Sequence, residues 1–237
     1  MKITNKDTPT IFFTSDLHFG HEGIIRMCNR PFQTLEEMDE TLIKNWNSLV
    51  KPKDKVYVLG DFFMYYKKPK LREILNRLNG TKILIKGNHD MTDREMENLG
   101  FSFVCRSATL MIANELVELS HYPYKKTNLE ILFWKALNKL FPKKFFKPRV
   151  FHDMLTDRGR FLLHGHTHST NRYKDRMIHV GVDAWKYKPV ALHEIGNLIS
   201  EIKRKELSGF SKYVFKFKRK YNEIFNILKS KIIERKK

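Results

Sequence analysis

Five short apolar segments of this chain end at residues whose side chains can bind a metal ion. Each segment is rich in residues typical of β-strands. The groups at their ends are Asp16 and His18; Asp61; Asn88, His89 and Asp90; His121; and His164, His166 and His168. Because ligands collect at the carboxyl ends of parallel strands, we expect the five ends to meet at one site. Oxygen and imidazole donors indicate a two-metal site for a hard, anionic substrate more than a thiolate-rich structural zinc site.

The order of these motifs resembles that of the calcineurin-like metallophosphoesterase superfamily. The motifs are D-x-H at residues 16–18, G-D at 60–61, G-N-H-D at 87–90, His121, and G-H-x-H at 165–168. Residues 15–32, with S-D-L-H-F-G-H followed by C-N-R-P-F, further resemble small bacterial and phage members. The resemblance covers about residues 10–195, apart from an apparent insertion.

The resemblance implies a centre of two divalent metal ions. Asp16, His18, Asp61 and His168 would hold one ion, and Asp61, Asn88, His121 and His166 the other, with Asp61 bridging. We expect manganese first, and iron, zinc or nickel suit the same mixed donors. A bridging carboxylate keeps two cations roughly 3.5 to 4 Å apart, so that both can bind one phosphoryl group. A metal-activated hydroxide would then attack phosphorus in line, without a covalent enzyme intermediate.

Residues next to these ligands are expected to act on the substrate. His89 is expected to protonate or stabilise the leaving oxygen, with Asp90 orienting and charging its ring. His21 either approaches a substrate phosphate or sits at a helix start, and Asn29 joins it as a substrate-binding candidate. Arg30 either donates to phosphate oxygens through its planar fork or forms a surface ion pair.

The remaining histidines receive structural or surface roles. His164 is expected to be structural, because alternation in an extended G-H-x-H segment would point His166 and His168 the same way. Structural or surface roles are also expected for His152, His179 and His193, while Asp183 and Trp185 are placed at the pocket edge.

These expectations favour a metal-dependent phosphoesterase, and among these a phosphodiesterase acting on a nucleotide, a cyclic nucleotide or a related ester. The alternative is a metal-dependent nuclease whose basic segments hold DNA or RNA. A third hypothesis is a non-catalytic scaffold that keeps the fold, which the complete ligand set and His89 disfavour.

The basic charge of the chain is concentrated in two segments. The formal net charge is +19, yet residues 125–150 hold eight Lys and Arg against one Glu, and residues 197–237 hold thirteen against four. Apolar residues recur at helical spacing in both segments, which indicates basic amphipathic helices. The insertion fits a surface helix, a lid, a nucleic-acid contact or a membrane-surface element. The tail fits its own domain, a second copy of the chain, an acidic lipid surface or nucleic acid.

Length and composition indicate a packed globular protein. A chain of 237 residues with 41% hydrophobic residues and eighteen Phe is sufficient for a substantial core. The resemblance implies a two-sheet β-sandwich flanked by helices, in four αββα layers. We assign residues 1–196 to the catalytic domain, with the insertion at about 125–160, and residues 197–237 to the tail. Two cysteines form no disulfide framework, and the lack of a signal peptide or a long apolar run predicts a cytoplasmic protein.

Local patterns predict the following elements. Helices are expected from residue 21, from 34 with a Thr34–Glu37 capping box, and over 69–78 and 92–99. Strands are expected over 10–15, 56–61, 82–90 and 101–105, in a hairpin over 108–120 turning at Asn114–Glu115, and over 178–185 and 190–195.

Overall fold

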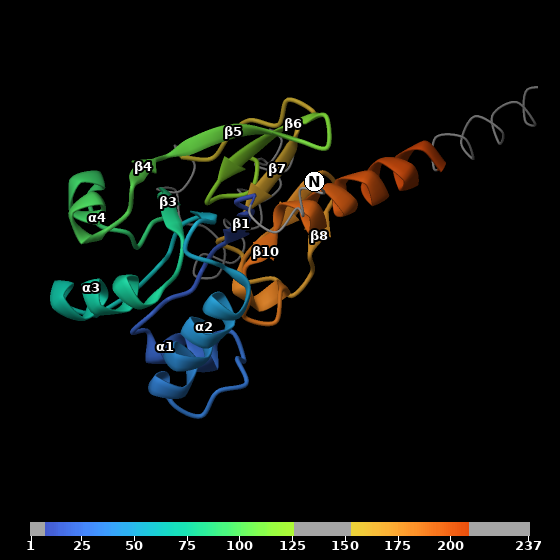
Figure 1. Cartoon of the computed structure of the whole chain (residues 1–237). Helices are drawn as coiled ribbons and strands as arrows, with labels where there is room; N and C mark the ends of the chain where they lie inside the picture. Colours follow the sequence, from blue (N-terminus) through green and yellow to red (C-terminus); the bar gives the residue numbers. More distant parts are fainter. Residues whose placement is uncertain (1–7, 126–152, 209–237) are drawn as a thin grey trace, which may run out of the picture. The chain divides into compact units, whose positions relative to one another are not determined.

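The computed structural model describes residues 8–125 and 153–208, which fall in two compact units, 1–196 and 197–237. The first unit contains all strands and the helices α1–α4 of the described residues (Figure 1). The described part of the second unit, 197–208, is helical. The expected insertion helix and the tail beyond residue 208 lie outside the described residues.

The first sheet has the strand order β10-β1-β2-β3-β4. Its members are β1 (Ile11–Thr14), β2 (Lys55–Val58), β3 (Thr81–Ile85), β4 (Phe103–Cys105) and β10 (Val190–Ala191). Strands β1 to β4 are parallel, and β10 pairs antiparallel with β1. The predicted parallel pairing of the KILIKGNHD strand, β3, with β2 is therefore confirmed. The helix between them provides the crossover that a parallel pair requires.

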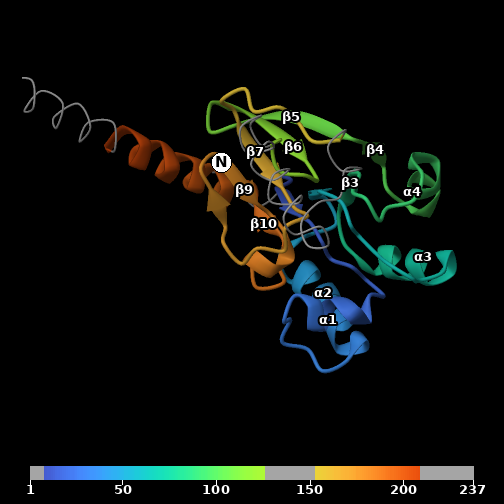
Figure 2. The same cartoon turned by 180° about the vertical axis from the view of Figure 1, so that it is seen from behind.

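Four helices connect these parallel strands. They are α1 (Glu22–Met27), α2 (Leu35–Leu49), α3 (Lys68–Arg77) and α4 (Asp93–Leu99). Their apolar side chains pack with those of the first sheet in one core cluster, which includes Trp46 from α2, Ile74 from α3 and Val58 from β2. Figure 2 shows the same helices from behind, on the side of the first sheet away from β5 and β6. Thr34 accepts a hydrogen bond from the Glu37 amide at 3.1 Å, so the predicted cap forms the start of α2.

The second sheet has the strand order β5-β6-β7-β9-β8. Its members are β5 (Ser107–Ile112), β6 (Glu115–Ser120), β7 (Phe161–His164), β8 (Tyr173–Lys174) and β9 (Met177–His179). Strands β6, β7 and β9 are parallel, whereas β5 and β8 are antiparallel to their neighbours. The hairpin turn lies at Ala113 and Asn114, with φ of 50° and 60°, one residue earlier than predicted.

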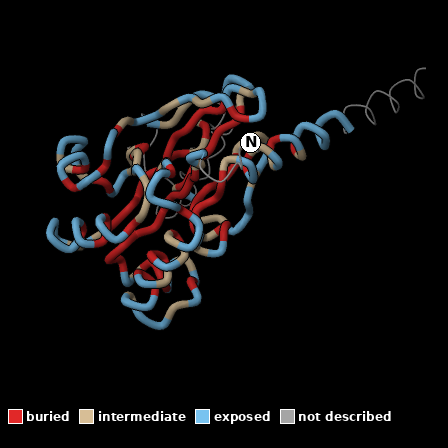
Figure 3. Tube along the Cα trace, viewed as in Figure 1, coloured by how far each residue is buried: buried red, intermediate tan, exposed pale blue. Residues whose placement is uncertain are grey.

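Several strands inside the two sheets are buried, including β1 and β7, whereas the helices and loops hold most of the exposed residues (Figure 3). Alternate residues of β1 illustrate this arrangement, because Phe12 joins the helix-side cluster whereas Phe13, also buried, is not part of it. The mixed α/β fold with two multi-strand sheets and flanking helices is thus confirmed.

The expected closing strands are shorter than predicted. Residues Val182–Ala184 form a 3-10 helix, and β10 ends at Ala191 because a helix starts at residue 192. The amide of Ala191 donates to the Glu194 carboxylate at 3.0 Å, an interaction that satisfies a donor at the helix start.

Candidate metal centre

All seven predicted ligands follow the carboxyl ends of strands that run parallel within their sheet. Asp16 and His18 follow β1, Asp61 follows β2 and Asn88 follows β3, while His121 follows β6 and both His166 and His168 follow β7. The loops after β1 and β2 are joined by hydrogen bonds from the amides of Asp16 and His18 to the carbonyls of Gly60 and Asp61, each 3.1 Å long. The ligand loops are therefore mutually fixed by backbone contacts.

The structure brings six of these residues into two clusters. Asp16, His18 and His168 form one cluster, and Asp61, His121 and His166 form the other, with the potential ligand atoms of each within 4.8 Å of one another. The seventh residue, Asn88, adjoins the second cluster, since its Oδ1 lies 3.1 Å from Nε2 of His121. Each cluster contains residues that the resemblance assigns to one and the same ion.

Asp61 lies between the two clusters. Its Oδ2 is 3.6 Å from Nε2 of His18 in one cluster and 3.5 Å from Nε2 of His121 in the other. A single buried carboxylate oxygen thus faces both sets of donors, the position that a bridging ligand requires.

The donors fit divalent cations. Both ring nitrogens of His18 are buried without a hydrogen-bond partner, which is costly unless a ligand satisfies one of them. Burial, with the nearby His168 and Arg30, lowers the pKa of His18 strongly, so the ring is held in the neutral form that binds metals. In His121, Nδ1 lies 2.8 Å from the carbonyl oxygen of Leu59, an arrangement that assigns the proton to Nδ1 and directs Nε2 to the centre.

Five of the ligands have left-handed backbone conformations. Asp16, His18, Asp61, His166 and His168 all have φ between 49° and 67°. Such conformations are uncommon for residues with a side chain, and clusters of them occur at functional sites. They also correct the expected extended G-H-x-H segment, because His166 and His168 follow the end of β7 and enter different clusters.

Two glycines permit the loops after β2 and β3 to approach each other. A Cβ on Gly60, which has φ of 81°, would collide with Gly87 and with the His121 ring. A Cβ on Gly87 would collide with Oδ1 of Asp61. The G-D and G-N-H-D motifs thus need their glycines for close packing of the ligand loops.

The carboxylate of Asp90 fixes these loops, which corrects its expected role. Its oxygens accept hydrogen bonds from the amides of Asp61 and Phe62, both 3.0 Å, and of Gly87 at 2.8 Å. We expected Asp90 to orient and charge the His89 ring. Its observed partners are backbone amides, so Asp90 positions the Asp61 loop instead.

Arg30 differs from both roles expected for it, a phosphate donor and a surface ion pair, because its ion pair is buried. It is 4% exposed, and its guanidinium donates to the carbonyls of Leu17 and Asp16 at 3.1 and 2.7 Å and contacts the Met38 sulfur. Its remaining donors bind both carboxylate oxygens of Asp183 at 2.9 and 3.1 Å. All five N–H groups are thereby used, leaving none for a substrate.

Asp183 connects this buried arginine to a predicted metal ligand, His168. Its Oδ2 lies 3.0 Å from Nδ1 of His168. Burial would raise the pKa of Asp183, but the His168 hydrogen bond and the Arg30 charge outweigh it and lower the pKa. Burial opposes protonation of His168, yet the bond to Asp183 raises its pKa. The sequence placed Asp183 only at the pocket edge, and no local spacing indicates its contact with His168.

The other substrate-binding and catalytic candidates occupy different positions. His89 has a side chain 36% exposed, with Nε2 3.9 Å from Oδ2 of Asp61. His21 is buried, its ring centroid lies 5.3 Å from that of His18, and burial lowers its pKa. Asn29 is exposed at the end of α1 with φ of 51°, and no contact places it at the clusters within the part of the chain that is described.

His164 and His179 are both buried. His164 pairs with His179 across β7 and β9, its Nδ1 lies 2.9 Å from the Gly165 carbonyl oxygen, and burial lowers its pKa to about 4. Burial also lowers the pKa of His179 to about 3, and its Nε2 lies 4.0 Å from Oδ2 of Asp16. Trp185, expected at the pocket edge, is buried and donates from Nε1 to the His179 carbonyl at 2.8 Å.

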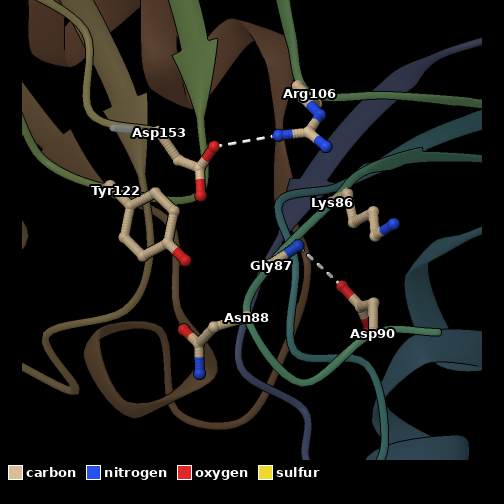
Figure 4. Close-up of a pocket in the computed structure, with 7 residues that line it drawn as sticks. All are labelled: Lys86, Gly87, Asn88, Asp90, Arg106, Tyr122 and Asp153. Atoms are coloured by element: carbon tan, nitrogen blue, oxygen red, sulfur yellow. Dashed lines mark hydrogen bonds and ion pairs between the residues drawn. The ribbon is translucent and has the colours of Figure 1, made fainter. Parts of the chain in front are cut away.

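A cavity of about 300 Å³ adjoins the second cluster (Figure 4). Its lining residues are Lys86, Gly87, Asn88, Asp90, Arg106, Tyr122 and Asp153. The Tyr122 ring centroid is 4.8 Å from the rings of both His121 and His166, so the cavity wall continues into the ligand set. Sequence reasoning missed Arg106 and Tyr122 as lining residues, although Tyr122 directly follows a predicted ligand.

The family model for calcineurin-like phosphoesterases matches residues 9–173. The chain belongs to this family. It is 34% identical to the uncharacterized protein MJ1445 of Methanocaldococcus jannaschii, over 81% of this chain and 92% of that protein. It is 31% identical to the gene 66 protein of Mycobacterium phage L5, over 82% and 96% of the two chains.

A solved structure is also similar to this calcineurin-like phosphoesterase. The crystal structure of AQ665, a protein of unknown function from Aquifex aeolicus, has a TM-score of 0.56 and 27% identity, and the match covers 81% of this chain and all of that one. The family and the two His and Asp clusters together support a metal-dependent phosphoesterase with a dinuclear centre.

Proposed function

We propose that the protein hydrolyses a phosphodiester at a centre of two divalent ions. The position of Asp61 between the His18 and His121 clusters is the observation that supports this proposal most directly. When bound, two cations supply Lewis-acid activation of water and neutralise charge that develops on the phosphoryl oxygens.

The residues of the chain hold and orient this centre. Asp90 fixes the backbone that carries Asp61, and Asp183 directs the His168 ring. Such outer contacts set the orientation and basicity of metal ligands. We assign manganese as the first candidate ion, with iron, zinc and nickel as alternatives for the same nitrogen and oxygen donors.

His89 is proposed to protonate or stabilise the leaving oxygen. Its partly exposed ring lies 5.6 Å from the His18 ring, centroid to centroid, and can therefore reach a substrate next to the centre. His21 remains our candidate for a contact with the substrate phosphate, because its ring packs against both His18 and the exposed Tyr65.

A diester is favoured over a monoester by the cavity beside Asn88. A phosphodiester carries a substituent on each side of phosphorus, and the cavity of about 300 Å³ offers room for the second one. This volume is at the lower end of the range typical of small-molecule sites.

The test is a metal-reconstituted activity screen over phosphomonoesters, diesters, cyclic nucleotides and nucleic acids. We expect hydrolysis of a diester such as bis(p-nitrophenyl) phosphate that depends on added divalent metal and stops with a chelator. Turnover confined to monoesters would contradict the diesterase proposal, and no metal-dependent turnover of any ester would contradict the enzymatic proposal.

The second candidate is a nuclease, favoured by the excess of basic residues in 125–150 and 197–237. Several neutralised phosphates would make nucleic-acid affinity fall steeply with rising salt. Deleting residues 200–237 would then weaken nucleic-acid binding while sparing hydrolysis of a small chromogenic diester.

The same basic segments support two further partner proposals, an acidic membrane surface and a second copy of the chain. Co-sedimentation with liposomes that requires anionic lipid tests the first, and the molecular mass in solution with and without the tail tests the second.

Among the described helices, none is long and apolar enough to cross a bilayer. A cytoplasmic location is our proposal.

A further inference from the structure

Arg106 is the arginine that faces the cavity beside the metal centre. It lies between β4 and β5, where the chain passes from the first sheet to the second. The carbonyl of the preceding residue, Cys105, accepts a 2.8 Å hydrogen bond from the amide of Lys86, which begins the loop that contains Asn88. Arg106 is thus attached through backbone contacts to a loop that carries a predicted metal ligand.

The guanidinium of Arg106 already holds an oxyanion. Its Nη1 lies 3.0 Å from Oδ1 of Asp153, and both residues line the cavity (Figure 4). The side chains are 75% and 42% exposed, so this ion pair contributes little to stability and is readily exchanged. Among the described residues, Asp153 is the one hydrogen-bond partner of this side chain.

The other cation of the lining is engaged elsewhere. The ammonium of Lys86 lies 2.8 Å from Oδ1 of Asp93, which is not among the lining residues. Asp90 uses its carboxylate on three backbone amides. Arg106 and Asp153 are therefore the charged pair that an entering ligand would meet.

We propose that Arg106 binds a second phosphate of the substrate, and that Asp153 occupies this position in the free protein. This inference rests on the proposed phosphodiesterase function. A guanidinium presents paired N–H donors that match phosphate oxygens, and a phosphate carries more charge than the Asp153 carboxylate it displaces. The preferred substrate class is then a nucleotide-sized phosphodiester with an additional terminal phosphate.

The experiment compares two chromogenic esters that differ by one group. The p-nitrophenyl ester of thymidine 5′-phosphate is used with and without a 3′-phosphate, and the ratio of their kcat/KM values reports the contribution of the second phosphate. We expect the ratio to exceed one in the unaltered protein. Arg106→Gln should reduce the ratio about tenfold, as expected for the loss of one charge-assisted hydrogen-bond pair. Asp153→Asn should raise it about two- to fivefold, because an exposed competitor is removed.

Arg77→Gln is the matched control. Arg77 on α3 forms an exposed ion pair with Glu40 on α2, and neither residue lines the cavity. Arg77→Gln therefore changes the net charge as much as Arg106→Gln does, without altering the proposed site. Thermal melting of each variant verifies folding. An Arg106→Gln ratio equal to that of Arg77→Gln would overturn the inference, as would an Asp153→Asn ratio that falls.

A binding measurement separates failure of this inference from failure of the proposed function. Titration calorimetry of the metal-loaded protein compares thymidine 3′,5′-bisphosphate with thymidine 5′-phosphate. We expect tighter binding of the bisphosphate, lost in Arg106→Gln, even if neither ester is hydrolysed. Equal affinities of the two nucleotides for the unaltered protein would overturn the role of Arg106. The diesterase proposal would be unaffected by that result, because the activity screen tests it separately.

Discussion

The guanidinium of Arg30 and the carboxylate of Asp183 form a buried, two-point ion pair across 153 positions of the sequence, at 2.9 and 3.1 Å. The same carboxylate bonds to His168, so the pair links the segment after α1 to the loop after β7. His168, a predicted metal ligand, thus contacts a buried carboxylate that is itself paired with Arg30.

Asp183→Asn is expected to lower the free energy of unfolding by about 3 kcal/mol, because it leaves the Arg30 charge uncompensated in a buried position. It should also weaken metal affinity about tenfold or more, since His168 loses its orienting partner. Chemical denaturation and metal titration calorimetry measure the two effects. A matched Glu40→Gln substitution removes an exposed ion pair and should change neither quantity appreciably. Unchanged metal affinity in Asp183→Asn would refute the orienting role.

Asp61→Asn is expected to weaken binding of both metal ions, because its Oδ2 faces both clusters. His168→Ala should weaken mainly the ion of the Asp16 cluster. We expect diester hydrolysis to fall by about 100-fold or more in each variant. Metal content measured by mass spectrometry distinguishes the two patterns, with His193→Ala, an exposed histidine outside the clusters, as control. Loss of one ion alone in Asp61→Asn would count against a bridging role.

His89→Ala is expected to retain both metal ions and to lose turnover in proportion to the difficulty of the leaving group. A general acid contributes roughly 100-fold or more when the leaving group is a poor one. We therefore expect a large loss with an alkyl diester and a small loss with bis(p-nitrophenyl) phosphate. Steady-state rates on the two substrates provide the comparison. Equal losses on both would exclude proton donation by His89.

Asp39 gives the stability of the protein a pH dependence of defined sign. Burial raises the pKa of Asp39 from 3.8 to about 6, although the Tyr66 hydroxyl donates a 2.8 Å hydrogen bond to it. The folded chain holds the Asp39 proton more tightly than the unfolded chain does. Protonated Asp39 therefore contributes about 3 kcal/mol to the free energy of unfolding below about pH 4, and this contribution is lost as the pH rises through about 6.

Asp39→Asn should remove this pH dependence, because the neutral amide resembles the protonated carboxyl and keeps the contact with Tyr66. Urea unfolding of the metal-free protein should show the variant more stable than the unaltered chain at pH 8, with the difference vanishing near pH 4. A difference that is constant between these two pH values would show that Asp39 does not titrate in the folded state in this range.

Local patterns predicted much of the fold. Helix α2 begins after Thr34 as expected, because the cap and the apolar spacing of residues 35–50 are properties of one short segment. The closing segment was predicted less well. A strand was expected over 190–195, but Glu194 binds the Ala191 amide and a helix replaces most of it.

Local sequence patterns were sufficient to predict which residues gather at the centre. Asp16 and Asp61 each stand where a parallel strand of the first sheet ends, and His121 stands where a parallel strand of the second sheet ends. Tertiary structure decided the partners of the charged groups around them. Arg30 meets Asp183, Asp90 meets backbone amides and Arg106 meets Asp153. Strand periodicity is a local property that sequence displays, whereas a long side chain finds its partner only after distant loops have packed together.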